Sequence, residues 1–304
     1  MAFWVGVPTS ERASERSVIQ TMKKLKAKIF DLFLPFRRLE KRQKMVASSL
    51  LLTAGLVIIQ TNDIKPNLQA VLWLSVLSFF LTFWSLREDI KGIEWLTLFI
   101  LPTFFSAGAV LFYFLWPVRW LTRLAVAIPF AVSFYAILLT ENIFNVAVLR
   151  TIALWRAAQV VSDFFTLITL FFLSATIFSL HLDFYLNTGL VFFVSIALLF
   201  QNLWAVRLEE KAEKDTLTVT ILGGLIMGEL TLALSFLPVD STNGALFLVT
   251  QMYAVIGVAK AKLNGKIDAN IVMEYMAMGL GGYFLTRLIL SLLQVVVTKY
   301  LTPF

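Results

Sequence analysis

Long apolar runs, separated by short polar connections, make up most of this chain. Because about 20 helical residues rising 1.5 Å each cross the hydrocarbon core of a bilayer, each run predicts a transmembrane helix. The runs lie at 45–61, 68–86, 93–116, 121–140, 160–180, 185–203, 216–237, 245–258 and 271–297, and the first and eighth are short. We therefore expect an all-α fold, a polytopic transmembrane helical bundle with about nine spans.

The residues that precede the first run divide into two parts. Residues 1–16 have no long apolar core, so we expect a flexible N-terminal tail and no signal peptide. In residues 17–44 apolar side chains recur at steps of three and four with basic ones between them, which predicts an amphipathic helix on the membrane surface. Its basic residues are Lys23, Lys24, Lys26, Lys28, Arg37, Arg38, Lys41, Arg42 and Lys44. Residues 45–304 are expected to form the transmembrane domain.

Composition agrees with a membrane protein. Of 304 residues, 59% are hydrophobic and 15% are charged, whereas a soluble protein has about 45–50% apolar and about 25% charged residues. The net charge of +7 is concentrated near the N-terminus. We interpret this asymmetry as a sign of membrane orientation, with no nucleic acid as partner. The expected partners of residues 17–44 are anionic lipid headgroups at the inner leaflet. The segment is either a topology anchor alone or also a docking site for a protein.

Positive charge alternates between the connections of the predicted spans. The basic residues fall mainly in every second connection, beginning with the one after the second span. Such residues are enriched on the cytoplasmic side of membrane proteins. The pattern predicts an N-terminus inside and a C-terminus outside.

The first candidate site is a polar segment between the fourth and fifth predicted spans. It contains Glu141, Asn142, Asn145, Arg150, Arg156, Gln159 and Asp163. We expect an interfacial helix here, on the inner face, with Asp163 about one turn inside the membrane. Arg156, Gln159 and Asp163 share one helix face at steps of three and four. The segment is either a polar mouth that binds a headgroup, an ion or a partner, or a snorkelling arginine paired with an interfacial acid.

The second candidate site joins the seventh and ninth spans. Small residues allow helix backbones to approach closely in lipid, and the packing glycines are Gly224, Gly228, Gly279, Gly281 and Gly282. Glu229 and Arg287 lie at similar depths, and a lone charge at the bilayer centre costs about 2.5–3.5 kcal/mol on insertion scales. We therefore predict a Glu229–Arg287 ion pair, with Gln251 as a candidate third member. The pair either fixes helix packing or has a transport or proton-linked role.

Motifs of enzymes and metal proteins are absent from the sequence. There is no cysteine and only one histidine, so no metal site is expected. The zinc motif HExxH, a glycine-rich phosphate loop and a GxSxG elbow with a partner histidine are also missing. No cofactor and no catalytic residue is predicted, and we do not favour an enzyme.

The stretch TENIFNVAVLRTIALWRAA, Thr140 to Ala158, resembles a segment of functionally uncharacterised multi-spanning membrane proteins from candidate-phylum bacteria. The resemblance implies a multi-pass protein of the bacterial cytoplasmic (inner) membrane and carries over no activity. The class that we favour is a transporter- or channel-like protein with a polar intramembrane site. The alternatives are a non-catalytic assembly or scaffold protein whose buried charges are structural, and a lipid-acting membrane enzyme.

Overall fold

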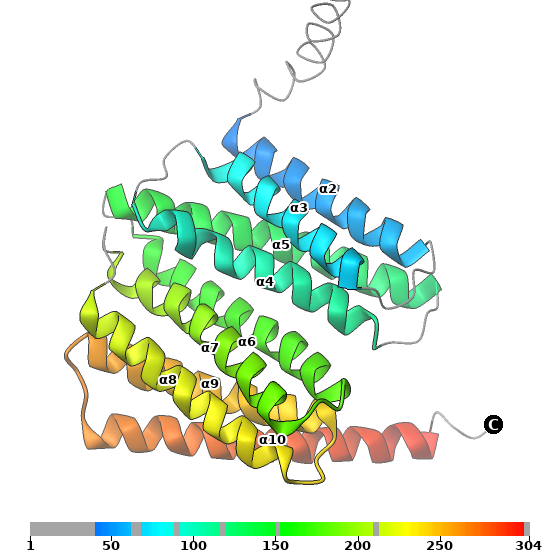
Figure 1. Ribbon diagram of the computed structural model, residues 1–304, viewed down its shortest axis with the longest axis vertical. Coiled ribbons are helices and arrows are strands. Elements are labelled where there is room, and N and C mark those ends of the chain that lie inside the picture. Colours follow the sequence, from blue (N-terminus) through cyan, green and yellow to red (C-terminus); the bar gives the residue numbers. More distant parts are fainter. Residues whose placement is uncertain are drawn as a thin grey trace, which may run out of the picture. The chain divides into compact units, whose positions relative to one another are not determined.

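A computed structural model describes residues 40–61, 68–87, 92–115, 120–149, 153–208 and 213–300. These residues form helices joined by short turns, with no strand among them (Figure 1). The helices are α2 (Lys41–Thr61), α3 (Leu68–Leu86), α4 (Glu94–Tyr113), α5 (Trp120–Leu149), α6 (Trp155–Ser179), α7 (Phe184–Arg207), α8 (Lys214–Ser235), α9 (Ser241–Leu263) and α10 (Ala269–Tyr300). The chain divides into two compact units, Met1–Lys44 and Met45–Phe304, and the helices lie almost wholly in the second.

Each predicted span overlaps one of these helices, so the all-helical architecture is confirmed. Eight helices, α2 to α9, are long and apolar enough to cross a membrane. The protein is therefore a multi-pass membrane protein by the length and composition of its helices. The ninth predicted span is also a helix, α10, but its crossing of the membrane stays a prediction. The eighth span is not short, because α9 contains 23 residues.

The predicted end of the fourth span is wrong. No interfacial helix follows the fourth span, because α5 continues as one helix of 30 residues to Leu149. The segment 141–149 lacks proline and glycine, and its polar Glu141 and Asn145 are buried inside the bundle. Helix α2 begins at Lys41, four residues before the predicted start of the first span. Lys41, Arg42 and Lys44 thus belong to the start of α2, while the basic residues Lys23 to Arg38 lie outside the described residues.

Aromatic rings fill the contact between α4, α5 and α6. Phe105 of α4 stacks on Phe130 of α5, and their ring centroids are 5.7 Å apart. The same ring contacts Phe165 and Phe172 of α6 at 5.9 and 6.2 Å. This part of the core is therefore packed with hydrocarbon.

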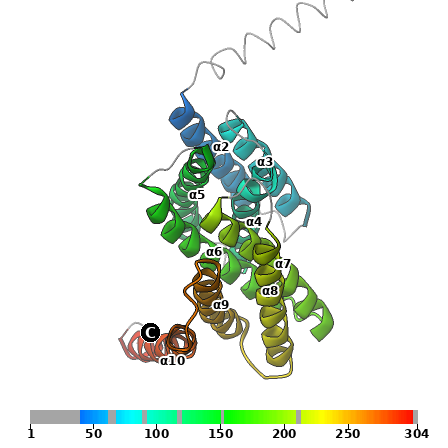
Figure 2. The ribbon, with the colours of Figure 1, turned by 90° about the vertical axis from the view of Figure 1, so that its left-hand side faces the viewer.

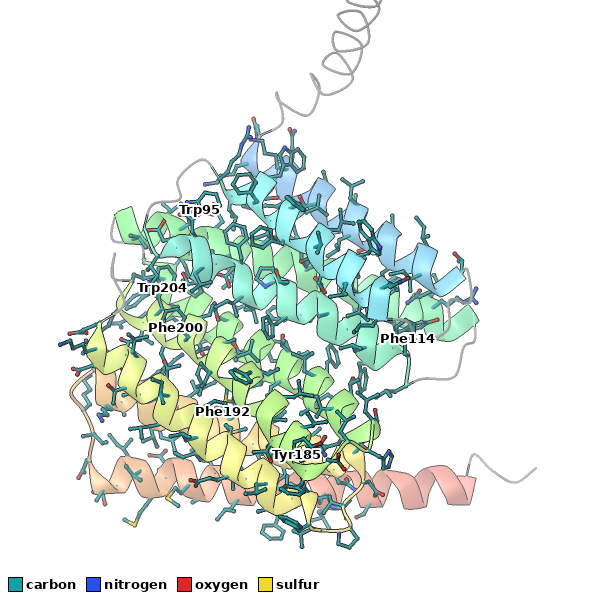
Figure 3. The ribbon with its side chains drawn as sticks, viewed as in Figure 1. Trp95, Phe114, Tyr185, Phe192, Phe200 and Trp204 are labelled. Carbon is teal, nitrogen blue, oxygen red and sulfur yellow. The ribbon has the colours of Figure 1, made fainter. Side chains whose placement is uncertain are left out.

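The helices alternate in direction, which brings every second connection to the same end of the bundle. Trp95 near the start of α4 and Trp204 near the end of α7 lie at one end, whereas Phe114 and Tyr185 lie at the opposite end (Figure 3). We call these the Trp204 end and the Tyr185 end. Helix α9 contacts both α8 and α10 and lies between them (Figure 2).

Candidate functional site

A polar network occupies the bundle near its Trp204 end. Its members come from four helices and form two hydrogen-bonded groups, which meet at the neighbouring residues Gln201 and Asn202 of α7. They are Glu141 of α5, Ser162, Asp163 and Thr166 of α6, Gln201 and Asn202 of α7, and Lys260 of α9. Other buried polar residues of the bundle, such as Thr169, Ser174 and Thr231, bond to a backbone carbonyl oxygen of their own helix.

Glu141 lies at the innermost part of the network. Its side chain has no exposed surface, and neither has that of Gln201. The Gln201 Nε2 group donates a hydrogen bond of 2.9 Å to Glu141 Oε1 and a longer one of 3.4 Å to Ser162 Oγ. One amide therefore holds a buried carboxyl group and links α5, α6 and α7.

Asp163 accepts two hydrogen bonds on one oxygen. Lys260 Nζ lies 2.5 Å from Asp163 Oδ1, and Asn202 Nδ2 donates to the same oxygen over 2.7 Å. Asn202 also lies 3.5 Å from Thr166 Oγ1. The side chains of Lys260 and Asp163 are 19% and 27% exposed, so this ion pair is half-buried and is the part of the network nearest to the surface.

The polar residues of α6 form a stripe that follows the helical period. Trp155, Gln159 and Asp163 are spaced by four residues, which places them above one another on the same helix face. Trp155 Nε1 and Gln159 Nε2 both donate to the carbonyl oxygen of Ala205, over 2.9 and 3.0 Å. These bonds join the first turns of α6 to the last turns of α7, and Ser162 and Thr166 continue the stripe inward.

Several buried oxygen atoms of this region have no hydrogen-bond partner among the described residues. They are Glu141 Oε2, Asn142 Oδ1, Asn145 Oδ1, Gln201 Oε1 and Asn202 Oδ1. All of them are acceptors, and buried acceptors are normally satisfied by a donor or a cation. Carboxylate and amide oxygens are also the ligands that hard cations prefer. Each of these oxygens is therefore available to a donor or a cation. No group of three His, Cys, Asp or Glu residues suited to a metal ion occurs in the described part of the chain.

The residues of the predicted polar segment lie in different environments. Asn145 is buried, and its Nδ2 donates to the carbonyl oxygen of Leu86 over 3.3 Å. Gln159 and Asp163 are half-buried, whereas Arg156, which the helical period places on the same side of α6, is exposed. Asp163 pairs with Lys260 and not with Arg156. Arg150 lies outside the described residues.

The predicted Glu229–Arg287 pair does not form within the described chain. Both side chains are exposed, and the ion pairs of the described residues join other partners. The reason is the position of α9. Helix α8 packs against α7 and α9, while α10 packs against α9, so α8 and α10 do not meet along their length.

The glycines of α8 do make a close helix contact, although with α7. A Cβ atom at Gly224 would collide with Ile196, and one at Gly223 would lie 2.7 Å from Leu199 Cδ1. Gly228 approaches Phe192 at 3.5 Å. The prediction of tight packing at this motif is therefore correct, but the predicted partner helix is wrong.

The glycines of α10 differ among themselves. A Cβ atom at Gly279 would lie 3.2 Å from Ala254 of α9, and one at Gly282 would lie 3.8 Å from Thr250. Gly281 has no atom within 4 Å. Gln251 lines a groove of about 400 Å³ between α8, α9 and α10, together with Lys262. Gln251 Nε2 has no partner among the described residues, so its predicted part in an ion pair is not realised.

The sequence interpretation missed Gln201, Asn202 and Lys260. Gln201 and Asn202 are adjacent polar residues inside an otherwise apolar run, which was a usable signal, because polar side chains at membrane depth normally face protein or water. Lys260 was assigned to a connection because the eighth span was predicted to end at 258. Nothing local in the sequence links Lys260 to Asp163, which lies 97 residues earlier.

The comparisons with known proteins give a family without a known activity. The family described as "Protein of unknown function (DUF5656)" matches residues 51–289, so the chain belongs to this family. No curated protein matches the chain. No solved structure matches it.

Proposed function

We propose that this DUF5656 protein is a transporter- or channel-like membrane protein that binds a proton or a small monovalent cation at Glu141. The observation that supports it is a fully buried carboxyl group with one oxygen bonded to Gln201 and the other without a partner. Ionisable residues at membrane depth are costly, and they often mark ion pathways and proton relays.

The ionised side chain of Glu141 would be a buried charge without a counter-charge among its hydrogen-bond partners. A buried carboxylate is costly unless it is paired and hydrogen-bonded. Gln201 supplies one hydrogen bond and no charge, and the ion pair of Lys260 is made with Asp163. A proton on Glu141, or a cation beside it, would remove the uncompensated charge. The unpartnered oxygen of Gln201 would be available to the same ligand.

The solvent exposure of the network decreases from the Lys260–Asp163 pair to Glu141. Lys260 and Asp163 are partly exposed, whereas Asn202, Gln201 and Glu141 are fully or almost fully buried. The hydrogen bonds connect Lys260 to Asp163, Asp163 to Asn202, and Gln201 to Glu141, and Gln201 and Asn202 are neighbours in α7. We propose that an ion enters beside the Lys260–Asp163 pair and that opening of this pair gives access to Glu141.

The same proposal includes an orientation and a location. Basic residues of the described chain gather at the Trp204 end, in Arg87, Arg156, Arg207, Lys214, Lys260, Lys262 and Lys266. The charge pattern supports placing this end in the cytoplasm. The resemblance of residues 140–158 to bacterial proteins supports the bacterial cytoplasmic membrane, where residues 17–44 would lie on anionic headgroups.

Flux measurements in vesicles test the function. The purified protein is placed in phospholipid vesicles that contain a pH-sensitive dye, and an inside-negative potential is imposed. A second arm uses a sodium-sensitive dye and a sodium gradient. We expect uptake in one arm, and we expect Glu141→Gln to reduce it to the rate of empty vesicles. Glu274→Gln, which changes an exposed acid of α10, is the matched control and should leave the rate unchanged. The proposal would be overturned if the unchanged protein and Glu141→Gln gave equal uptake rates in both arms.

A scaffold role is the second candidate, and the packed core favours it. Phe105, Phe130, Phe165 and Phe172 fill the space between α4, α5 and α6. The groove that Gln251 lines between α8, α9 and α10 contains no residue of the polar network. In this case the buried polar groups fix the packing of the helices, and vesicles with the protein should be as tight to protons and sodium as empty ones.

A further inference from the structure

Glu229 is an acid on the outside of the helical bundle. It lies 15 residues after Lys214 in α8, a helix of 22 residues, and its side chain is exposed. No ion pair or hydrogen bond joins it to a described residue. The residue therefore faces either lipid or another protein, and an unpaired charge facing lipid is costly.

The surface around Glu229 is a groove between α7 and α8. The groove has a volume of about 420 Å³, and its lining includes Thr188, Gly189, Phe192, Gly228 and Glu229. A Cβ atom at Gly189 would have no atom within 4 Å, so a helix can approach the backbone there. Thr188 Oγ1 is buried without a partner among the described residues. Tyr185 and Phe192, labelled in Figure 3, lie along the α7 side of this surface.

Arg287 is a base on the outside of the same bundle. It lies 18 residues after Ala269 in α10, and its side chain is exposed. The ring of Tyr283 contacts Phe247 of α9, with centroids 5.2 Å apart. Just beyond it, Phe284 and Leu288 are 69% and 56% exposed. This part of α10 thus presents one positive charge between large apolar side chains.

The depths of the two charges match. Helices α8 and α10 both start at the Trp204 end, because the antiparallel helix α9 lies between them in the chain. Measured from the helix starts, the two residues differ by about three positions, which is roughly 5 Å of helical rise. An arginine side chain spans this offset. Copies of one protein in a membrane share their orientation, so the depths also match between two copies.

We propose that Glu229 of one copy pairs with Arg287 of a second copy, whose α10 lies in the groove between α7 and α8. The contact satisfies two charges that have no partner among the residues the structure describes, and it covers Phe284 and Leu288 with the small-residue groove around Gly189. Helices α8 and α10 lie on opposite sides of α9 (Figure 2). The contact is therefore head-to-tail, and it repeats until a ring closes in the plane of the membrane.

Cross-linking in lipid vesicles tests this contact cleanly because the chain has no cysteine. One preparation carries Glu229→Cys, and a second, distinguished by a tag, carries Arg287→Cys. The two are mixed, reconstituted together and treated with a short bis-maleimide. We expect a dimer that contains both tags, and a ladder of larger products when one chain carries both cysteines. The control pairs Glu229→Cys with Glu274→Cys, which lies 13 residues before Arg287 and about 20 Å away along α10, and it should give no product.

Reversal of the two charges tests whether the contact between copies depends on the ion pair. Glu229→Arg alone and Arg287→Glu alone should each lower the oligomer mass measured by light scattering in detergent. The chain with both reversals should recover the mass of the unchanged protein. A monomeric unchanged protein, absence of the mixed cross-link, or a double reversal that assembles no better than the single changes would overturn the proposal. Proton or sodium flux is not the readout, so this inference stands or falls apart from the proposed function.

Discussion

At the scale of single residues, the hydrogen bond between Gln201 and Glu141 is the contact with the clearest energetic consequence. Bulk solvent does not reach Glu141 to replace a lost partner, because its side chain has no exposed surface. Removing one partner of a buried pair costs more than replacing both by apolar groups, since the remaining polar group keeps its desolvation penalty.

Gln201→Leu should therefore lower the free energy of unfolding by about 1–3 kcal/mol. The double change Glu141→Leu with Gln201→Leu should recover part of this loss, because both polar groups are then gone. Thermal unfolding of the purified protein in detergent measures both effects. A double variant less stable than Gln201→Leu would show that Glu141 is held by other contacts.

Residue chemistry was easier to predict than residue pairing. The sequence indicated that Asp163 is a membrane-depth carboxylate that needs a partner, and it has one in Lys260. Arg156, two turns earlier in the same helix, was the cation nearest to Asp163 in the sequence, but the ion pair is made with Lys260 of α9. Which helix supplies the cation depends on how α6 and α9 pack, and no local periodicity carries that information.

At the scale of helices, the number and location of the spans follow from length and apolarity, because a bilayer imposes both on every crossing helix. The helix ends were less predictable. Polar residues such as Glu141 and Asn145 resembled the end of a span, whereas the structure buries them against neighbouring helices and α5 continues. A polar residue in a run can mark an interface with water or a contact with another helix, and only packing distinguishes the two.

Two glycines that the sequence treats alike should respond differently to substitution. Gly224→Ala should destabilise the protein by about 1–3 kcal/mol, because the added methyl group collides with Ile196 of α7. Gly281→Ala should change stability by less than about 0.5 kcal/mol, because Gly281 has no atom within 4 Å. Thermal unfolding of the two variants side by side makes the comparison. Equal losses would mean that the contact with α7 does not set the cost, since alanine favours a helix more than glycine does at both positions.

At the scale of the whole molecule, the bundle has two unlike ends. Arg207 illustrates the Trp204 end. Its Nη2 donates to the carbonyl oxygen of Leu263 over 2.8 Å, and it forms an ion pair with Glu213. The Tyr185 end carries Asp183 and Asp240 beside the starts of α7 and α9. This difference in charge is the physical basis of the proposed orientation.

Accessibility of single cysteines tests that orientation. Thr242→Cys lies near the start of α9, and Asn264→Cys follows its end. A membrane-impermeant maleimide added to intact cells should label the cysteine at 242 and should reach the one at 264 only after the membrane is opened. The reverse pattern would place the Trp204 end outside the cytoplasm and would require the ion to enter from the outer face.

The length of α5 makes the thickness of the bilayer a variable that acts on the polar network. Its 30 residues extend about 45 Å at 1.5 Å per residue, well beyond a hydrocarbon core of about 30 Å. Such a helix tilts, or leaves its last turns outside the core, according to the local mismatch. Glu141 lies in the final third of α5, so lipids with longer acyl chains would immerse it and lipids with shorter chains would bring it toward the headgroups. The acyl composition of the host membrane would then set the energy of the buried carboxyl group without any change in the sequence.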